Sequence, residues 1–127
     1  MLPPPREAPK VLLKEKEVYR FWIKLHRDFP KVERLGIGKK IEQSFLDLLE
    51  LTFTSVYLAP EQKVVVLGRA IAKLDNLKFF MQLAWEARLI HTENYAIIST
   101  NLEEIGMMLW GWRKGLQEKL QQKTPTK

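Results

Sequence analysis

The sequence predicts an all-α protein, an up-down antiparallel four-helix bundle. Its 127 residues suffice for one domain with a buried core. In four successive segments the apolar residues recur with the helical period of 3.6, and short stretches with proline, glycine or threonine separate them. No two neighbouring segments show the alternation expected of paired strands, so we expect four helices around one core.

The two ends of the chain differ in composition from the segments between them. Pro3, Pro4 and Pro5 predict a disordered, Pro-rich tail over residues 1–9, and QQKTPTK predicts a second one over 121–127. The bundle then occupies residues 10–120. We expect no export signal, no membrane-spanning helix and, with no cysteine in the chain, a cytoplasmic protein without disulfides.

The first helix is expected over residues 10–28 and ends before Phe29-Pro30, because a residue before proline avoids the α region. Val11, Val18 and Trp22 share its apolar face. Its opposite face carries Lys16, Arg20, Lys24 and Arg27. The connection that follows contains Gly36 and Gly38, which predict flexibility, and four basic residues: Lys31, Arg34, Lys39 and Lys40.

The second helix is expected from Ile41 to about Tyr57 and the third from Pro60 to about Ile90, since proline suits the first position of a helix. In the third helix, Phe79, Phe80 and Leu83 point away from the stripe of core residues. A helix that is apolar almost all the way round is buried on more than one side. We therefore expect a second copy of the chain over this surface.

The fourth helix is expected to follow Thr92, a suitable N-cap. Its core residues are spaced alternately by three and four, a spacing typical of near-parallel helix packing: Tyr95, Ile98, Leu102, Ile105, Leu109, Trp112 and Leu116. Met107 and Trp110 lie off that seam and extend the predicted oligomer interface. Trp22, Trp85 and Trp112 are expected in the core, and an interface role suits Trp110 better than base stacking.

The positive charge of the chain is concentrated in its first third. Residues 1–40 contain eleven Lys and Arg against five Asp and Glu, a surplus equal to the net charge of +6 of the whole chain. Such a surplus favours an anionic partner, and the eight basic residues of the first helix and the connection predict sequence-independent binding of nucleic-acid phosphates. The alternative is a solvated face whose charge is partly offset by Glu15, Glu17 and Asp28.

Three segments resemble a known family. IGKKIEQSFLDLLEL (37–51), RAIAKLDNLKFFMQLAWE (69–86) and EIGMMLWGW (104–112) are similar to the accessory variability (Avd) proteins of diversity-generating retroelements. FPKVERLG (29–36) resembles the first connection in the wider four-helix bundle family, which includes proteins encoded in intervening sequences of bacterial 23S ribosomal RNA. The similarity covers roughly residues 10–119. Met107 and Trp110 depart from the family pattern, which has arginine and glycine at these positions.

The resemblance implies a bacterial or phage-encoded homopentamer that associates with the reverse transcriptase of the retroelement. It implies binding of template RNA and complementary DNA in support of mutagenic reverse transcription, with no catalytic role. Two alternatives remain: a protein–protein adaptor without a nucleic-acid role, and a helical ribonuclease using Arg20 and His26. These two residues lie about 120° apart on a helix, and neither His26 nor His91 has a metal-ligand partner at i+4. We expect no catalytic residue, no metal and no cofactor.

Overall fold

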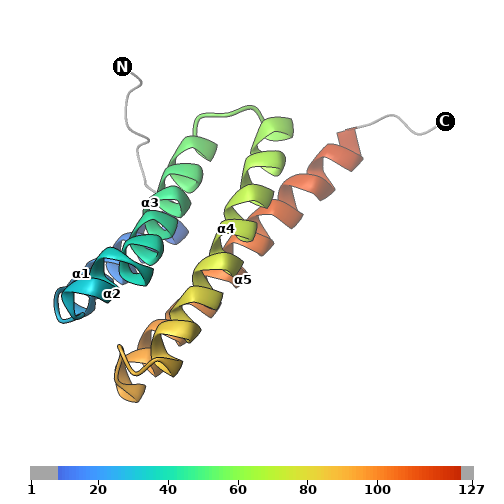
Figure 1. The fold of residues 1–127 in the computed structure, drawn as a ribbon. Helices are drawn as coiled ribbons and strands as arrows, with labels where there is room; N and C mark the ends of the chain where they lie inside the picture. Colours follow the sequence, from blue (N-terminus) through green and yellow to red (C-terminus); the bar gives the residue numbers. More distant parts are fainter. Residues whose placement is uncertain (1–8, 124–127) are drawn as a thin grey trace.

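The computed structural model describes residues 9–123 and is all-α in this range (Figure 1). Four long helices account for most of it: α1 (Lys10–Arg27), α3 (Ile37–Ser55), α4 (Pro60–Glu86) and α5 (Thr92–Lys123). A five-residue helix, α2 (Lys31–Leu35), lies between α1 and α3. The predicted tails lie largely outside the described residues, apart from Pro9, which directly precedes α1, and residues 121–123, which continue α5.

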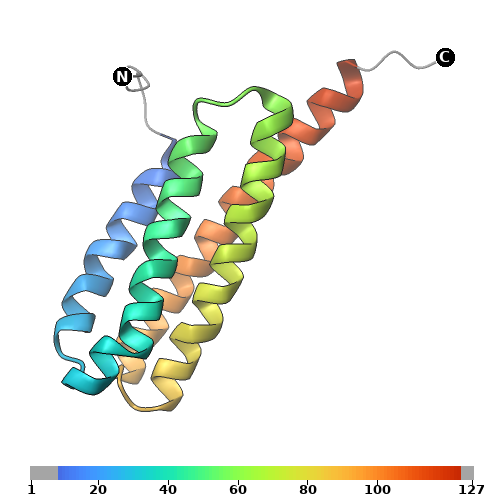
Figure 2. The same ribbon diagram turned by 45° about the horizontal axis from the view of Figure 1, so that its top comes forward.

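The four long helices lie side by side and each packs on two others (Figure 2). α1 packs on α3 and α5, and α4 packs on the same two helices, while α2 contacts α3. The buried stripes meet in one core, as the sequence periodicity predicts. Its largest fully buried side chains come from every long helix and include Trp22, Phe45, Leu48, Leu74, Leu77, Met81, Leu102, Ile105 and Leu109.

The connection between α1 and α3 differs from the predicted flexible segment. Residues 31–35 form α2, and α3 begins at Ile37, four residues before the predicted start. Gly38 is buried inside α3, where the neighbouring α1 leaves no space for a side chain. A Cβ atom at this position would lie 2.5 Å from Nε2 of His26. The glycine therefore serves close packing.

The turn after α4 ends that helix at Glu86, four residues before the predicted boundary. The N–H of Leu89 donates to the carbonyl of Ala84, and the N–H of Arg88 donates to the carbonyl of Trp85, both at 2.9 Å. This is the Schellman arrangement of a helix C-terminus. Arg88 occupies the left-handed position with φ 64°, which is usually glycine.

The start of α5 also differs from the prediction. Thr92 is the first residue of α5 and therefore not the N-cap that was predicted. Its Oγ1 accepts a hydrogen bond of 3.1 Å from Nε1 of Trp85. Trp85 is half-buried and stacks on Tyr95. Of the three tryptophans expected in the core, only Trp22 is fully buried, since Trp112 is half-buried as well.

At its other end α5 continues past the start of α4 and projects from the rest of the structure (Figures 1 and 2). Leu116, near this end, is partly buried although it belongs to the predicted core seam. Between residues 9 and 123, no helix combines the length and the apolar character needed to cross a bilayer.

Candidate nucleic-acid interface

The basic face of α1 is fully turned to solvent. Lys16, Arg20, Lys24 and Arg27 are all exposed and lie opposite the buried Val18 and Trp22. None of the four forms an ion pair with a carboxylate among residues 9–122. Their charges are therefore available to an external anion.

Glu15 does not offset the charge of this face, contrary to the sequence-based alternative. Its side chain is fully buried on the α3 side of α1, where Oε2 accepts a 2.8 Å hydrogen bond from Oγ1 of Thr52. Oε1 has no hydrogen-bond partner in the described structure. Burial raises the pKa of this carboxyl to about 8, against the smaller opposite effect of the Thr52 hydrogen bond, so most Glu15 side chains are uncharged at pH 7.

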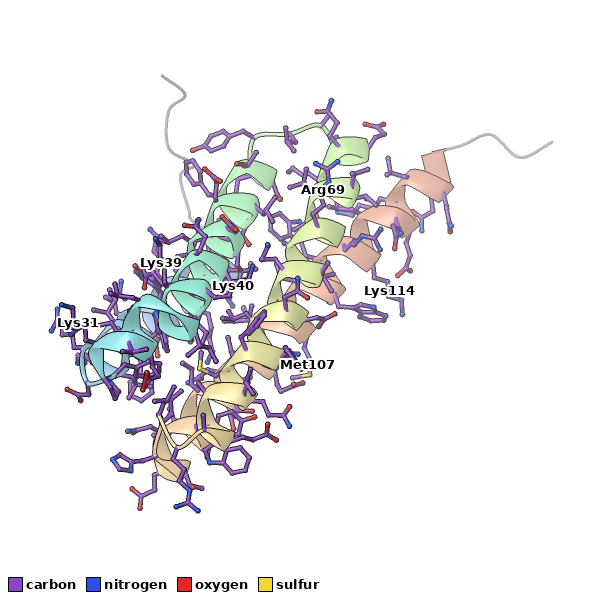
Figure 3. The ribbon with its side chains drawn as sticks, viewed as in Figure 1. Lys31, Lys39, Lys40, Arg69, Met107 and Lys114 are labelled. Atoms are coloured by element: carbon purple, nitrogen blue, oxygen red, sulfur yellow. The ribbon has the colours of Figure 1, made fainter. Side chains whose placement is uncertain are left out.

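The second basic group of residues is carried by α2 and the first turn of α3. Lys31 and Arg34 are exposed on α2, and Lys39 and Lys40 are exposed on α3. The α2 helix and the first turn of α3 form a corner of the structure. Figure 3 shows Lys31 and Lys39 on the outer side of this corner, whereas Lys40 lies on the side of α3 nearer α4. The ammonium of Lys40 lies 5.8 Å from the ring centroid of Phe80.

A polar cluster beneath this corner fixes it to α1. Glu42 of α3 accepts hydrogen bonds from the hydroxyl of Tyr19 and, at 2.9 Å, from Nε1 of Trp22. Desolvation and the neighbouring Glu42 carboxylate raise the pKa of Tyr19 to about 12. His26 stacks on Trp22, and its Nε2 lies 3.2 Å from the backbone carbonyl oxygen of Arg34. The cations of α2 and α3 are therefore held in a defined position relative to those of α1.

Several cations outside the first forty residues are engaged by neighbours. Lys73 pairs with Asp47 at 3.5 Å, and Lys78 pairs with Glu103 at 3.1 Å. Nε of Arg113 donates a 2.8 Å hydrogen bond to the carbonyl oxygen of Val64. Five others have no carboxylate partner among residues 9–122 and are distributed over α4, α5 and the turn between them: Lys63, Arg69, Arg88, Lys114 and Lys119. The densest group of unpaired cations thus lies on α1, α2 and the start of α3.

The structure places Arg20 and His26 on different sides of α1. Arg20 borders a groove between α1 and α5, together with Ile97 and Asn101. His26 faces α2 and α3, where it packs against Trp22 and next to Gly38. The two side chains proposed for a helical ribonuclease therefore do not converge on one site in this arrangement.

The residues of the predicted oligomer interface lie on α4 and α5 and differ in exposure. Phe79 is 61% exposed, Met107 67% and Trp110 57%, with Leu83 less exposed. Phe80 is partly buried and packs against the core of the same chain. Met107 and Trp110 border a groove of about 580 Å³ between α4 and α5. The ammonium of Lys114 lies 4.8 Å from the Trp110 ring, and Figure 3 shows Lys114 and Met107 on α5.

Sequence reasoning missed the groove between α1 and α5. Ile97 is 50% exposed there, next to the buried Ile98. The available signal was the pair Ile97-Ile98, in which Ile98 belongs to the predicted core seam and Ile97 does not. Phe21 and Asn101, which also line this groove, carried no such signal.

No protein-family model matches the sequence. No curated protein matches it either.

Proposed function

We propose that this chain is a non-catalytic accessory protein of a diversity-generating retroelement. In this role it binds template RNA and complementary DNA without sequence specificity, and it associates with the reverse transcriptase. The observation that carries the nucleic-acid part is the group of eight exposed cations on α1, α2 and the first turn of α3, none of which pairs with a carboxylate among residues 9–122. Lys and Arg side chains of this kind release counterions from phosphates, which gives affinity without base readout.

The resemblance to the Avd proteins supports the retroelement context, the reverse transcriptase as partner and a homopentamer in the cytoplasm. An up-down antiparallel arrangement of the four long helices is part of the proposal. The short connections at 56–59 and 87–91 support it, as does the packing of each long helix on two others. The exposed Phe79 and Trp110 provide apolar surface for contact between subunits or with the enzyme.

Binding to labelled, mixed-sequence RNA and DNA of 20 nucleotides, measured by fluorescence anisotropy from 50 to 300 mM salt, tests the proposal. We expect micromolar or tighter binding at low salt and a linear, steep fall of log affinity with log salt. RNA incubated with the protein should stay intact on a denaturing gel, because the protein is proposed to be non-catalytic.

The adaptor is the second candidate, supported by the apolar side chains exposed on α4 and α5. It predicts capture of the reverse transcriptase without any affinity for free RNA or DNA at 100 mM salt. That combination of results would replace the proposal. Cleavage of the RNA that is lost on substitution of His26 would instead favour the ribonuclease.

A further inference from the structure

The groove between α1 and α5 lies directly beside the basic face of α1. It encloses about 300 Å³, and its lining includes Glu17, Arg20, Phe21, Lys24, Ile97 and Asn101. Arg20 and Lys24 thus belong both to the row of exposed cations and to the rim of the groove. When these cations bind a phosphate, a group attached to that phosphate can therefore reach into the groove.

The lining combines three kinds of chemistry. Phe21 packs against the core and is half-buried, so part of its ring borders the groove, and Ile97 adds exposed apolar surface opposite it on α5. The Asn101 amide is half-buried and makes no hydrogen bond within residues 9–122, so its donor and acceptor are free for a ligand. The Glu17 carboxylate is an additional acceptor on the α1 side.

A ligand that matches this lining has a flat apolar face, polar edges and an attached anion. An unpaired nucleotide has all three: a base that stacks on an aromatic ring, edge groups that hydrogen-bond to an amide, and a phosphate for Arg20 and Lys24. A base inside a duplex is stacked between its neighbours and paired along its edge, so a duplex offers only its phosphates to the same cations.

We infer that the α1–α5 groove receives unpaired bases, which makes single-stranded nucleic acid the preferred ligand of the basic face. The inference rests on the proposed nucleic-acid function and narrows the ligand from nucleic acid in general to single strands. It applies to RNA and DNA alike, because neither stacking nor phosphate contact requires the 2′-hydroxyl. The cations of α2 and α3 then contribute affinity for single strands and duplexes equally.

The test compares an unstructured 24-nucleotide strand with a 24-nucleotide hairpin, each as RNA and as DNA, so that the number of phosphates is the same. We expect the wild-type protein to bind the unstructured strand at least fivefold more tightly at 100 mM salt. Phe21→Leu keeps an apolar side chain at the core and removes the aromatic face. Loss of one base–aromatic stack costs roughly fivefold or more in affinity, and we expect this loss for the strand alone.

Two further variants complete the experiment. Ile97→Ser alters only an exposed residue of α5, so its folding is secure even if Phe21→Leu disturbs the core, and it should reduce the preference for the single strand as well. Phe53→Leu is the matched control, because Phe53 is an aromatic residue of α3, 50% exposed and not part of this groove. We expect it to change neither affinity. Circular dichroism verifies the helicity of each variant.

The outcomes separate the inference from the proposed function. Equal affinity for strand and hairpin, or a preference that survives both groove variants, would overturn the inference and leave phosphate binding intact. Absence of binding to every nucleic acid would overturn the proposed function and the inference with it. A 2-aminopurine base in the strand gives an independent reading, since its fluorescence should fall on binding to the wild type and recover with Phe21→Leu.

Discussion

Oγ1 of Thr52 on α3 donates a 2.8 Å hydrogen bond to Oε2 of Glu15 on α1, in a contact from which solvent is excluded. The second carboxyl oxygen of Glu15 is buried without a partner among the described residues. A carboxylate in this position has lost its hydration and regained one hydrogen bond, which explains why the pKa of Glu15 is raised to about 8.

Glu15 should make the stability of the protein depend on pH. Its native pKa of about 8 exceeds its ordinary value of 4.5, so the native state binds a proton more tightly than the unfolded state. The resulting stabilisation is complete below about pH 4.5, declines as the pH rises and is lost above about pH 8, a decline of roughly 5 kcal/mol. Glu15→Gln, which cannot ionise, should remove most of this slope in urea denaturation between pH 5 and 8.5.

The control for this prediction is Glu17→Gln on the same helix, because Glu17 is exposed. Its denaturation midpoints should follow those of the wild type at each pH. A wild-type slope that persists in Glu15→Gln would assign the pH dependence to another group.

The four cations of the α1 face should account for a large part of the salt dependence of nucleic-acid binding. We expect the joint change of Lys16, Arg20, Lys24 and Arg27 to Gln to flatten the slope of log affinity against log salt by up to about three units, since each lost phosphate contact contributes about 0.7–0.9. Mixed-sequence RNA and DNA should be affected alike, because phosphate contacts carry no base information.

Two further quadruple variants locate the interface by the same titration. Changing Lys31, Arg34, Lys39 and Lys40 to Gln tests the corner formed by α2 and α3. Changing Lys63, Arg69, Lys114 and Lys119 to Gln removes the same charge from α4 and α5 and serves as the control. The largest loss of slope in this control variant would place the interface on α4 and the exposed part of α5.

The exposed apolar residues of α4 should hold two copies of the chain together. Phe79→Glu with Leu83→Glu places charges where the single chain has solvent-exposed side chains, so helicity should be unchanged. In an interface these charges would be desolvated, and the assembly should dissociate to a smaller species in analytical ultracentrifugation. Gln43→Glu with Glu50→Gln, on the exposed face of α3, keeps the charge and should keep the assembly. A monomeric wild type would rule out this interface.

Glu42 should stabilise the α1–α3 contact through the hydrogen bonds that it accepts from Tyr19 and Trp22. Glu42→Ala leaves the indole N–H of the fully buried Trp22 without its partner, and we expect a loss of about 1–3 kcal/mol in the free energy of unfolding. Glu42→Gln retains a carbonyl acceptor and should lose less. The control is Glu50→Ala on the exposed face of α3, which should change the free energy of unfolding by less than about 0.5 kcal/mol. A similar loss in Glu42→Ala and Glu50→Ala would refute the stabilising role of Glu42.

Gly38 and Gly111 should respond in opposite ways to the same substitution. Gly38→Ala introduces a Cβ atom 2.5 Å from Nε2 of His26, and we expect a destabilisation of about 1–3 kcal/mol. A Cβ atom at Gly111, in α5, meets nothing within 4 Å, so Gly111→Ala should stabilise the protein by about 0.5–1 kcal/mol through helix propensity. Thermal denaturation of both variants measures these changes in stability. Equal changes in Gly38→Ala and Gly111→Ala would contradict the packing of His26 on α3.

The sequence by itself determined the helices and the stripes that form the core. Trp22, Phe45, Leu77 and Leu102 are fully buried as their periodicity predicts, because a residue's face on a helix is set by its local position along the chain. The concentration of positive charge in the first forty residues is likewise a property of the sequence. The helix ends were less well determined. The α2 helix and the start of α3 pack against His26 of α1, and the turn at Arg88 has a left-handed residue that no glycine marks in the sequence.

Only the tertiary structure decided what covers the flanks of each stripe. Glu15 reads as a surface charge in the sequence but is buried, because α3 packs over the side of α1 on which it lies. Phe80 reads as part of an outer surface but lies partly against the core and Lys40. Periodicity identifies the centre of an apolar face, whereas the neighbours of its edges follow from how helices far apart in the chain pack together. For the same reason the groove beside Arg20 exists only when α5 lies next to α1.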